Sequence, residues 1–349
     1  MSSPVKPPFA TSRTLRTPDE LIAAGMAPPD GRADLQAVAQ QYATAVPPAF
    51  ASLMESPNDP IGVQVIPTAQ ELLVAPEERS DPIGDDALSP VPGIVHRYAD
   101  RALLKPLLVC PLYCRFCFRR EHVGPDGGVL DEEALDRALD WLRTHEQIRE
   151  VILTGGDPLM LSPRRLGDIV QALSAMPHIT TIRVHTRVPV AAPERVTDAL
   201  LDALETEKAM WMAVHVNHAR EMAPTARSCL RRIARRGIPL LGQSVLLRGV
   251  NDSEEALESL FRTMVENRMR PYYLHQLDPA PGTAHFHVPV EQGQRLLAGL
   301  RGRVTGLAWP IYVLDIPGGY GKVPLGPDYI LGPQQVRDPE GKTHALDRL

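Results

Sequence analysis

Three of the four cysteines of the chain lie within eight residues, in the segment CPLYCRFC. Cys110, Cys114 and Cys117 are separated by three and by two residues, and basic side chains follow directly after them. Three kinds of chemistry use cysteines placed this close together: a disulfide, a zinc site and an iron–sulfur cluster. The spacing alone leaves all three open.

The other candidate ligands narrow this choice. Four cysteines in 349 residues do not form a disulfide framework. A structural zinc site has four protein ligands, but Cys229 falls in the apolar row of a predicted helix and is expected in the core, which leaves His122 as a fourth ligand. A complete iron–sulfur cluster takes four cysteines, so three would leave one iron open to a small molecule. We favour the cluster, with a zinc-binding structural module as the alternative.

Two further motifs carry residues that could do chemistry. TGGDPL (154–159) has two glycines, which let the backbone approach a ligand closely. DIPGGYGK (315–322) places Lys322 after a glycine-rich turn but lacks the Gly-x₄-Gly-Lys-Ser/Thr pattern of a nucleotide-binding loop. Asp278 and Asp315 end two successive predicted strands, and paired carboxylates in a closed cavity repel each other until a cation arrives.

From residue 101 onward, β-rich runs alternate with stretches of helical periodicity. Strands are predicted at 102–109, 150–155, 180–186, 210–216, 239–247, 271–277 and 310–316. Helices are predicted at 132–146, 165–176, 193–205, 223–237, 254–268 and 291–303. Six or seven such βα units in series predict a parallel barrel, full or partial, with its chemistry at the C-terminal ends of the strands. The motifs above all lie at those ends.

The first 92 residues predict helical pieces broken by prolines, of which the chain has 35. The pieces are expected at 17–25, 35–46 and 69–76, and the first has Thr17 as its N-cap, followed by Pro18 and Glu20. We divide the chain into an N-terminal helical extension (1–92), a barrel core (93–325) and a tail (326–349).

The composition excludes several classes of partner. The net charge of −5 argues against binding to nucleic acid or to an anionic membrane, because both attract proteins with an excess of basic residues. The sequence has no run of 18 apolar residues, and its first residues lack the apolar segment of a secretory signal. We expect a cytoplasmic protein without a nucleic-acid or membrane partner.

Together the motifs resemble those of the lysine 2,3-aminomutase family of radical S-adenosylmethionine (SAM) enzymes. The cysteine spacing is similar to the superfamily signature, and TGGDPL is similar to its GGE-type motif. PGGYGK resembles the family's PGGGGK motif, with Tyr320 in place of the third glycine. The resemblance runs from SPVPGIVHRYADR (89–101) to Lys322. It implies a partial (βα)6-type radical SAM barrel with an N-terminal helical extension.

The resemblance also implies three cofactors and a site for each. A [4Fe-4S] cluster would be held by Cys110, Cys114 and Cys117. SAM would lie against Gly155, Gly156, Asp157, His215 and Gln243. Pyridoxal 5′-phosphate (PLP) would be bound covalently by Lys322 and surrounded by Arg97, Arg101 and Arg187.

The substrate implied by the resemblance is L-lysine. Arg119 would bind its carboxylate, and Asp278 and Asp315 would bind its ε-ammonium group. The expected reaction exchanges an amino group and a hydrogen between C2 and C3 and gives β-lysine, which makes the protein an isomerase. Another ω-amino acid such as ornithine, a catabolic role, and a radical SAM enzyme without PLP are the alternatives.

Shorter members of the family lack a cysteine-rich zinc segment that longer members carry. The 27 residues after Lys322 contain no cysteine, and Ser253 stands where the longer members have one. The shorter members make β-lysine for attachment to elongation factor P, and we expect this chain to do the same. The resemblance further implies flavodoxin or ferredoxin as the electron donor and a homo-oligomer, either a dimer or a tetramer.

Overall fold

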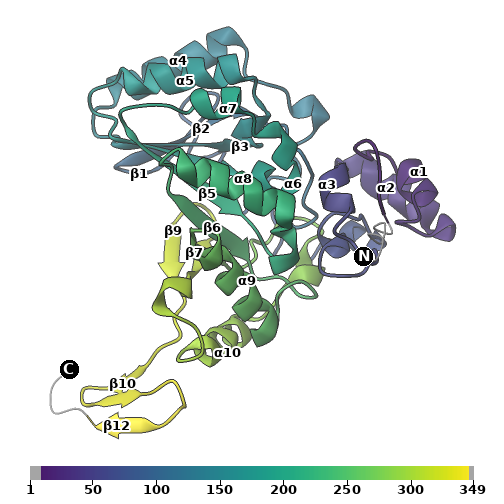
Figure 1. Ribbon diagram of the computed structural model, residues 1–349, viewed down its shortest axis with the longest axis vertical. Coiled ribbons are helices and arrows are strands. Elements are labelled where there is room, and N and C mark those ends of the chain that lie inside the picture. The colour runs from purple at the N-terminus through teal and green to yellow at the C-terminus, as the bar shows by residue number, and fades with distance from the viewer. Residues whose placement is uncertain (1–8, 346–349) are drawn as a thin grey trace, which may run out of the picture.

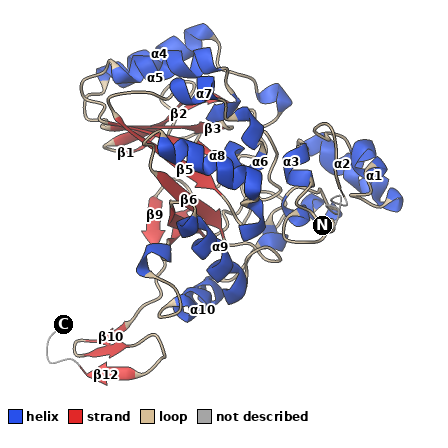
Figure 2. Cartoon of the chain, viewed as in Figure 1, coloured by secondary structure: helices blue, strands red, loops and turns tan. Residues whose placement is uncertain are grey.

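The computed structural model describes residues 9–345, and its central element is a nine-stranded sheet in which the strands follow one another in chain order (Figures 1 and 2). The strands are β1 (Ile94–Tyr98), β2 (Arg101–Leu107), β3 (Glu150–Gly155), β4 (Thr181–Thr186), β5 (Ala209–His215), β6 (Leu240–Val245), β7 (Met269–His275), β8 (Ile311–Ile316) and β9 (Gly321–Pro324). Strands β2 to β8 are parallel, while β1 and β9 are antiparallel edges. The two edges do not pair in the described residues, so the barrel is open.

Helices follow the strands and cover the outer face of the sheet (Figure 1). They are α4 (Glu132–Thr144), α5 (Pro163–Ser174), α6 (Val188–Ala191), α7 (Asp198–Asp202), α8 (Pro224–Arg235), α9 (Glu254–Glu266) and α10 (Val290–Leu300). Each long helix buries one apolar face, such as Ala138 and Leu142 of α4, in a core shared with the outward-facing side chains of the strands. No helix in the described part of the chain has the length and apolar character needed to cross a membrane.

The predicted partial barrel is confirmed, and the predicted strands agree with β2 to β8 to within two residues at each end. Three local features differ from the expectation. The sheet has two extra strands: β1, which forms a hairpin with β2 through Ala99 and Asp100, and β9, which pairs with β8. The helix expected at 193–205 is reduced to α7, because Thr197 caps a new start there. The tail forms a small separate sheet of β10 (Ile330–Gly332), β11 (Gln335–Arg337) and β12 (Thr343–Ala345).

The N-terminal extension contains three helices: α1 (Pro18–Ala23), α2 (Arg32–Gln41) and α3 (Pro48–Ala51). The predicted cap is present, since Thr17 and Glu20 form a reciprocal capping box. The piece expected at 69–76 is only a 3₁₀ turn, Ala69–Leu72. Apolar side chains of the extension form a second core that includes Leu112 of the cysteine loop. The extension therefore packs directly on the segment that carries the cysteines.

A buried ion network joins the extension to that segment. The Glu71 carboxylate accepts hydrogen bonds of 3.0 Å from Arg115 Nε and pairs with Arg120, and all three side chains are buried. Burial alone would raise the pKa of Glu71, but Arg115 and Arg120 lower it below its ordinary value. Because desolvated charges are costly unless paired, each member of the network depends on the others.

Replacing Glu71 with glutamine should leave two buried guanidinium groups without a counter-charge. We expect Glu71→Gln to lower the free energy of unfolding by about 3–5 kcal/mol, measured as a shift of the urea midpoint. Glu77→Gln is the matched control, because Glu77 is exposed, and it should change stability by less than about 0.5 kcal/mol. Equal shifts in both variants would contradict the prediction.

Candidate active site

A cavity of about 510 Å³ runs along the inner face of the sheet to the C-terminal ends of the parallel strands. Its wall contains every site residue predicted from the sequence, namely Arg97, Arg101, Cys110, Cys114, Cys117, Arg119, Gly155, Gly156, Asp157, Arg187, His215, Gln243, Asp278, Asp315 and Lys322. These residues come from almost every strand end of the barrel. The fold therefore gathers them in one place, although proximity alone does not assign their roles.

The three cysteines follow β2 and have free thiols that share one environment. Burial raises the pKa of Cys110 well above its ordinary value, and Asp157 and the two other thiols add to this. Burial and Cys114 raise the pKa of Cys117 to about 11. Cys110 and Cys117, whose pKa values are raised by burial and by the neighbouring thiols, suit a positively charged metal group, which would stabilise them as thiolates. The cysteine loop therefore fits an iron–sulfur cluster.

The alternative zinc ligands are not gathered with these cysteines. His122 lies 3.9 Å from Asp86, and Cys229 is buried in the helical core of α8, as predicted. Within residues 9–345, no three His, Cys, Asp or Glu side chains are grouped closely enough for a single metal ion. The closed four-ligand geometry of structural zinc is therefore not formed by this loop.

The Gly155–Gly156 turn lets the ends of β2 and β3 touch. Gly155 has a φ of +104°, in the region that favours glycine, and a Cβ at Gly156 would lie 2.4 Å from the carbonyl oxygen of Val109. Asp157 accepts hydrogen bonds from the Thr186 hydroxyl (2.8 Å) and from the backbone N–H of Arg187 (2.7 Å). This loop thus braces the cysteine loop on one side and the end of β4 on the other. Its predicted contact with SAM stays a prediction.

Arg187 lies on the cysteine side of the cavity. Its Nη1 donates a hydrogen bond of 2.9 Å to the sulfur of Cys114, and its Nη2 donates to Gln64 (2.6 Å) and Glu221 (2.9 Å). Burial alone would lower the pKa of Arg187, but Glu221 and Cys114 raise it. The described hydrogen-bond partners of the guanidinium group are therefore one cysteine of the loop and two buried side chains, Gln64 and Glu221. The contact with PLP expected from the sequence stays a prediction.

Five charged side chains of alternating sign connect the other end of the cavity. Lys322 pairs with Asp315, and Asp315 pairs with Arg97 at 3.0 Å. Arg97 lies 3.5 Å from Asp85, which in turn forms an ion pair with Arg119 Nη2 at 2.7 Å. Alternation keeps each buried charge next to an opposite one. Asp85 is the member that sequence reasoning missed.

Asp278 faces these charges without a direct ion pair in the described residues. Burial, followed by the nearby Asp315, raises the pKa of Asp278 to about 7, against the opposing effect of Lys322. This carboxyl group is therefore only partly ionised near neutral pH, and a cationic ligand would favour its ionised form. The geometry brings the two predicted aspartates together beside Lys322, as a diammonium-type ligand would require.

Other polar side chains on the cavity wall were not predicted. His185 and Arg183 occupy alternate positions of β4, and His275 lies on β7. Burial, with Arg183 next, lowers the pKa of His185 well below its ordinary value, and burial lowers that of His275 to about 4. Both imidazoles are therefore neutral. The signal in the sequence is the polar half of the alternation in TIRVHT, whose apolar half faces the helices.

Several buried nitrogen atoms on this wall have no hydrogen-bond partner among the described residues. They are Nε of Arg97 and Arg187, and Nε2 of His185 and His215. Buried polar groups are almost always paired in folded proteins, so these atoms mark positions for a polar ligand. Arg101, which lies over the Tyr98 ring at 3.7 Å, is half-buried at the rim. Arg97, which shares Asp315 with Lys322, therefore offers an unpaired donor to an anionic cofactor beside Lys322.

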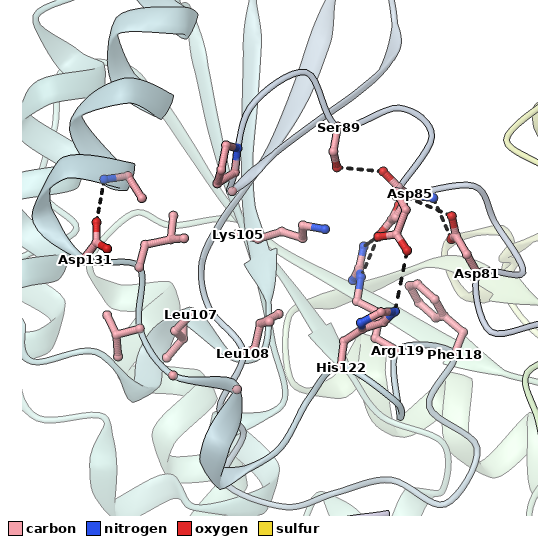
Figure 3. Close-up of a pocket in the computed structure, with 18 of the residues that line it drawn as sticks. Asp81, Asp85, Ser89, Lys105, Leu107, Leu108, Phe118, Arg119, His122 and Asp131 are labelled. Carbon is pink, nitrogen blue, oxygen red and sulfur yellow. Dashed lines mark hydrogen bonds and ion pairs between the residues drawn. The ribbon is translucent and has the colours of Figure 1, made fainter.

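A second cavity of about 420 Å³ lies behind the pair of Asp85 and Arg119 (Figure 3). Lys105 of β2 extends into it, as Figure 3 shows. Burial and Arg119 lower the pKa of Lys105, against the opposing effect of Asp85. Asp85 is thus shared between three cations, and its position fixes the wall between the two cavities.

His215 and Gln243 are neighbours across β5 and β6, where they form a register pair. The His215 ring stacks on Phe116 of the cysteine loop with ring centroids 5.7 Å apart. The structure therefore brings both residues beside the cysteines. Their predicted contact with SAM stays a prediction.

Two family models match this chain. Residues 104–261 match the family model of the radical SAM superfamily, and residues 297–338 match that of lysine-2,3-aminomutase. An L-lysine 2,3-aminomutase of Fusobacterium nucleatum is 40% identical over 82% of this chain and 68% of its own length. An L-lysine 2,3-aminomutase of Escherichia coli is 36% identical, with 81% and 83% covered. A glutamate 2,3-aminomutase of Clostridioides difficile is 33% identical, with 85% and 71% covered.

The contact between the glycine turn and the cysteine loop can be tested with one methyl group. Gly156→Ala places a Cβ against the backbone of Val109, so we expect a loss of about 1–3 kcal/mol in stability and a lower iron and sulfide content after anaerobic reconstitution. Gly306→Ala is the control, because nothing lies within 4 Å of a Cβ there. Full iron and sulfide content in Gly156→Ala would show that the contact does not shape the loop.

Proposed function

Because the chain belongs to the lysine 2,3-aminomutase family of the radical SAM superfamily, we propose that it converts L-lysine into β-lysine. The protein is an isomerase, a radical SAM aminomutase whose cofactors are a [4Fe-4S] cluster, SAM and PLP. The observation that supports lysine as substrate is the pair of carboxyl groups, Asp278 and Asp315, placed in one cavity with Arg119.

The residues of the cavity divide between the three cofactors. Cys110, Cys114 and Cys117 would hold the cluster. The loop at Gly156 and the pair His215 and Gln243 would hold SAM beside it. Lys322 would hold PLP, with Arg97 and Arg101 near its phosphate. When bound, these groups supply the radical and the temporary covalent link that migration of an amino group between neighbouring carbons requires.

Arg119 is prepared to bind a carboxylate. Its Nε donates a hydrogen bond of 2.8 Å to one oxygen of Asp85, and its Nη2 lies 2.7 Å from the same oxygen in an ion pair. Nη1 has no described partner, so it is available to a second carboxylate at the cavity wall. Because Asp85 fixes the plane of the guanidinium group, it orients this donor before the substrate arrives.

The opposite end of the substrate would be held by the two aspartates. Asp315 is neutralised by Lys322 and Arg97 in the described structure. Covalent use of Lys322 would remove one of these cations and release Asp315 for another. An ε-ammonium group could then lie between Asp315 and Asp278. The side-chain carboxylate of glutamate would be repelled at the same place, which supports lysine over the substrate named for the Clostridioides difficile relative.

The use of β-lysine to modify elongation factor P stays a prediction from the resemblance to shorter family members, as do the electron donor and the oligomeric state. Ornithine is the second substrate candidate, because it carries the same charges on a side chain one methylene shorter.

Anaerobic incubation with SAM, PLP, dithionite and one amino acid at a time tests the proposal. We expect lysine to give β-lysine, detected by mass spectrometry, with glutamate unchanged. Asp278→Asn and Asp315→Asn should lower kcat/KM for lysine by about 30-fold or more, because each removes a charged contact of about 2 kcal/mol or more. Asp136→Asn, on the exposed face of α4, should have no effect. Turnover of glutamate without turnover of lysine would refute the substrate assignment.

The raised pKa of Asp278 predicts a dependence of lysine affinity on pH. Only the ionised carboxyl group attracts an ammonium group, and with a pKa of about 7 this form is lost as the pH falls. The dissociation constant for lysine should therefore rise about tenfold per pH unit below pH 7 and level off above it, as measured by calorimetry. Asp278→Asn should bind lysine weakly and without this dependence between pH 5.5 and 8. The same slope in that variant would place the titrating group elsewhere.

A further inference from the structure

An open groove of about 830 Å³ lies between the N-terminal extension, α8 and α9. One wall is formed by Leu53, Met54 and Glu55, and the other includes Arg227 and Arg231 of α8. Helix α8 lies over the outer face of the sheet (Figure 1), so the groove is separate from the substrate cavity inside the barrel.

The groove carries an excess of positive charge in a chain whose net charge is negative. Helix α8 has the sequence PTARSCLRRIAR, with no acidic residue. Arg232 and the capping residue Arg236 pair with Asp198 and Asp202, outside the groove. Arg227 and Arg231 pair with no carboxylate in the described part of the chain. Unpaired guanidinium groups of this kind attract an anionic surface.

A third arginine in the groove, Arg220, is partly neutralised by Asp59 at 2.9 Å and Glu55 at 3.5 Å. Of the charged side chains that line the groove, three are cationic and one, Glu55, is anionic. The groove is therefore positive even when its own acidic residue is counted. Leu53, which is half-buried, adds an apolar surface beside the arginines, while Met54 and Met222 are buried.

A buried residue next to the groove residues in the chain, Glu221, is connected to the cysteine loop by two hydrogen bonds in series. Glu221 lies between the groove residues Arg220 and Met222 in the chain and is itself buried. Glu221 accepts from Arg187 at 2.9 Å, and Arg187 donates to the sulfur of Cys114 at 2.9 Å. Two buried side chains, Glu221 and Arg187, would therefore separate a partner in the groove from a cluster ligand.

We propose that this groove docks a small acidic electron-carrier protein, of the flavin or iron–sulfur class, which reduces the cluster. The proposal rests on the proposed function, because it requires the cluster to be held by the cysteine loop. In the step, the carrier loses one electron and the cluster gains it, with no bond formed or broken. Charge complementarity chooses the partner: an acidic carrier meets unpaired arginines, and steering by such charges raises the association rate.

Binding can be measured independently of turnover. The probe is a purified acidic flavodoxin, titrated calorimetrically into the anaerobically reconstituted protein at low salt and at 0.3 M NaCl. We expect Arg227→Gln combined with Arg231→Gln to weaken binding about tenfold at low salt and to reduce the salt dependence. The control combines Arg232→Gln with Arg236→Gln, which removes the same charge from the same helix on its paired side, and should change affinity less than about twofold.

The single variant Arg231→Gln is a control for an effect on folding. The side chain of Arg231 makes no described hydrogen bond or ion pair, whereas Arg227 donates to the Met222 carbonyl. The single variant should weaken flavodoxin binding about threefold. An effect confined to Arg227 would point to loss of local structure and would overturn the docking site.

Reduction kinetics distinguish this proposal from the proposed function. In stopped-flow absorbance measurements, the groove variants should slow reduction by flavodoxin about tenfold and leave reduction by dithionite unchanged, since dithionite needs no docking surface. Equal effects of the groove and control pairs, or tight binding of a DNA duplex or a second copy of the chain through the same arginines, would overturn the docking site. Absence of lysine turnover with dithionite would instead overturn the proposed function, and the flavodoxin affinities would still stand.

Discussion

The pairing of buried opposite charges is the interaction on which this site depends. Lys322, Asp315, Arg97, Asp85 and Arg119 follow one another around the cavity with alternating sign. An isolated charge in such an enclosure costs several kcal/mol, so no member could be kept there alone. The alternation also makes two of these charges available to a ligand. When Lys322 is engaged elsewhere, the Asp315 carboxylate is freed, and a bound carboxylate would fill the remaining donor position of Arg119. The same arrangement that makes the empty cavity stable therefore selects a ligand with separated positive and negative ends.

Hydrogen-bond acceptors for three arginines come from the proline-broken extension. Gln64 holds Arg187, Glu71 holds Arg115, and Asp85 holds Arg119, and each arginine belongs to the barrel or its cysteine loop. Prolines suit this task, because they fix an irregular path without requiring a helix or strand that would expose unpaired backbone groups. The extension is thus part of the site, because it places hydrogen-bond acceptors along the cysteine loop. The Gly156 contact supports the same loop from the β3 side.

The sequence allowed the barrel and the cavity residues to be predicted because both depend on local patterns. Alternation places β2 to β8, and the strand-end rule places Asp278, Asp315 and Lys322 in one region. Asp85 could not be found in this way, since it is one of several acidic residues in a segment without periodicity. The orientation of Arg187 was equally inaccessible, because it is set by partners 123 and 34 residues away. The strands β10 to β12 are three residues each, too short to show alternation.

Arg187 connects the two functional regions of the molecule. Its guanidinium group contacts the Cys114 sulfur on the cavity side and Glu221 on the side of the arginine groove. A positive group hydrogen-bonded to a ligand sulfur favours the more negative state of a cluster, and Glu221 moderates this effect by sharing the charge. The substrate and SAM would close the cavity side during the reaction, so an electron has to arrive from the opposite side. On that side the cysteine loop is covered by Glu221, its neighbouring residues and the extension. The molecular surface there is positive.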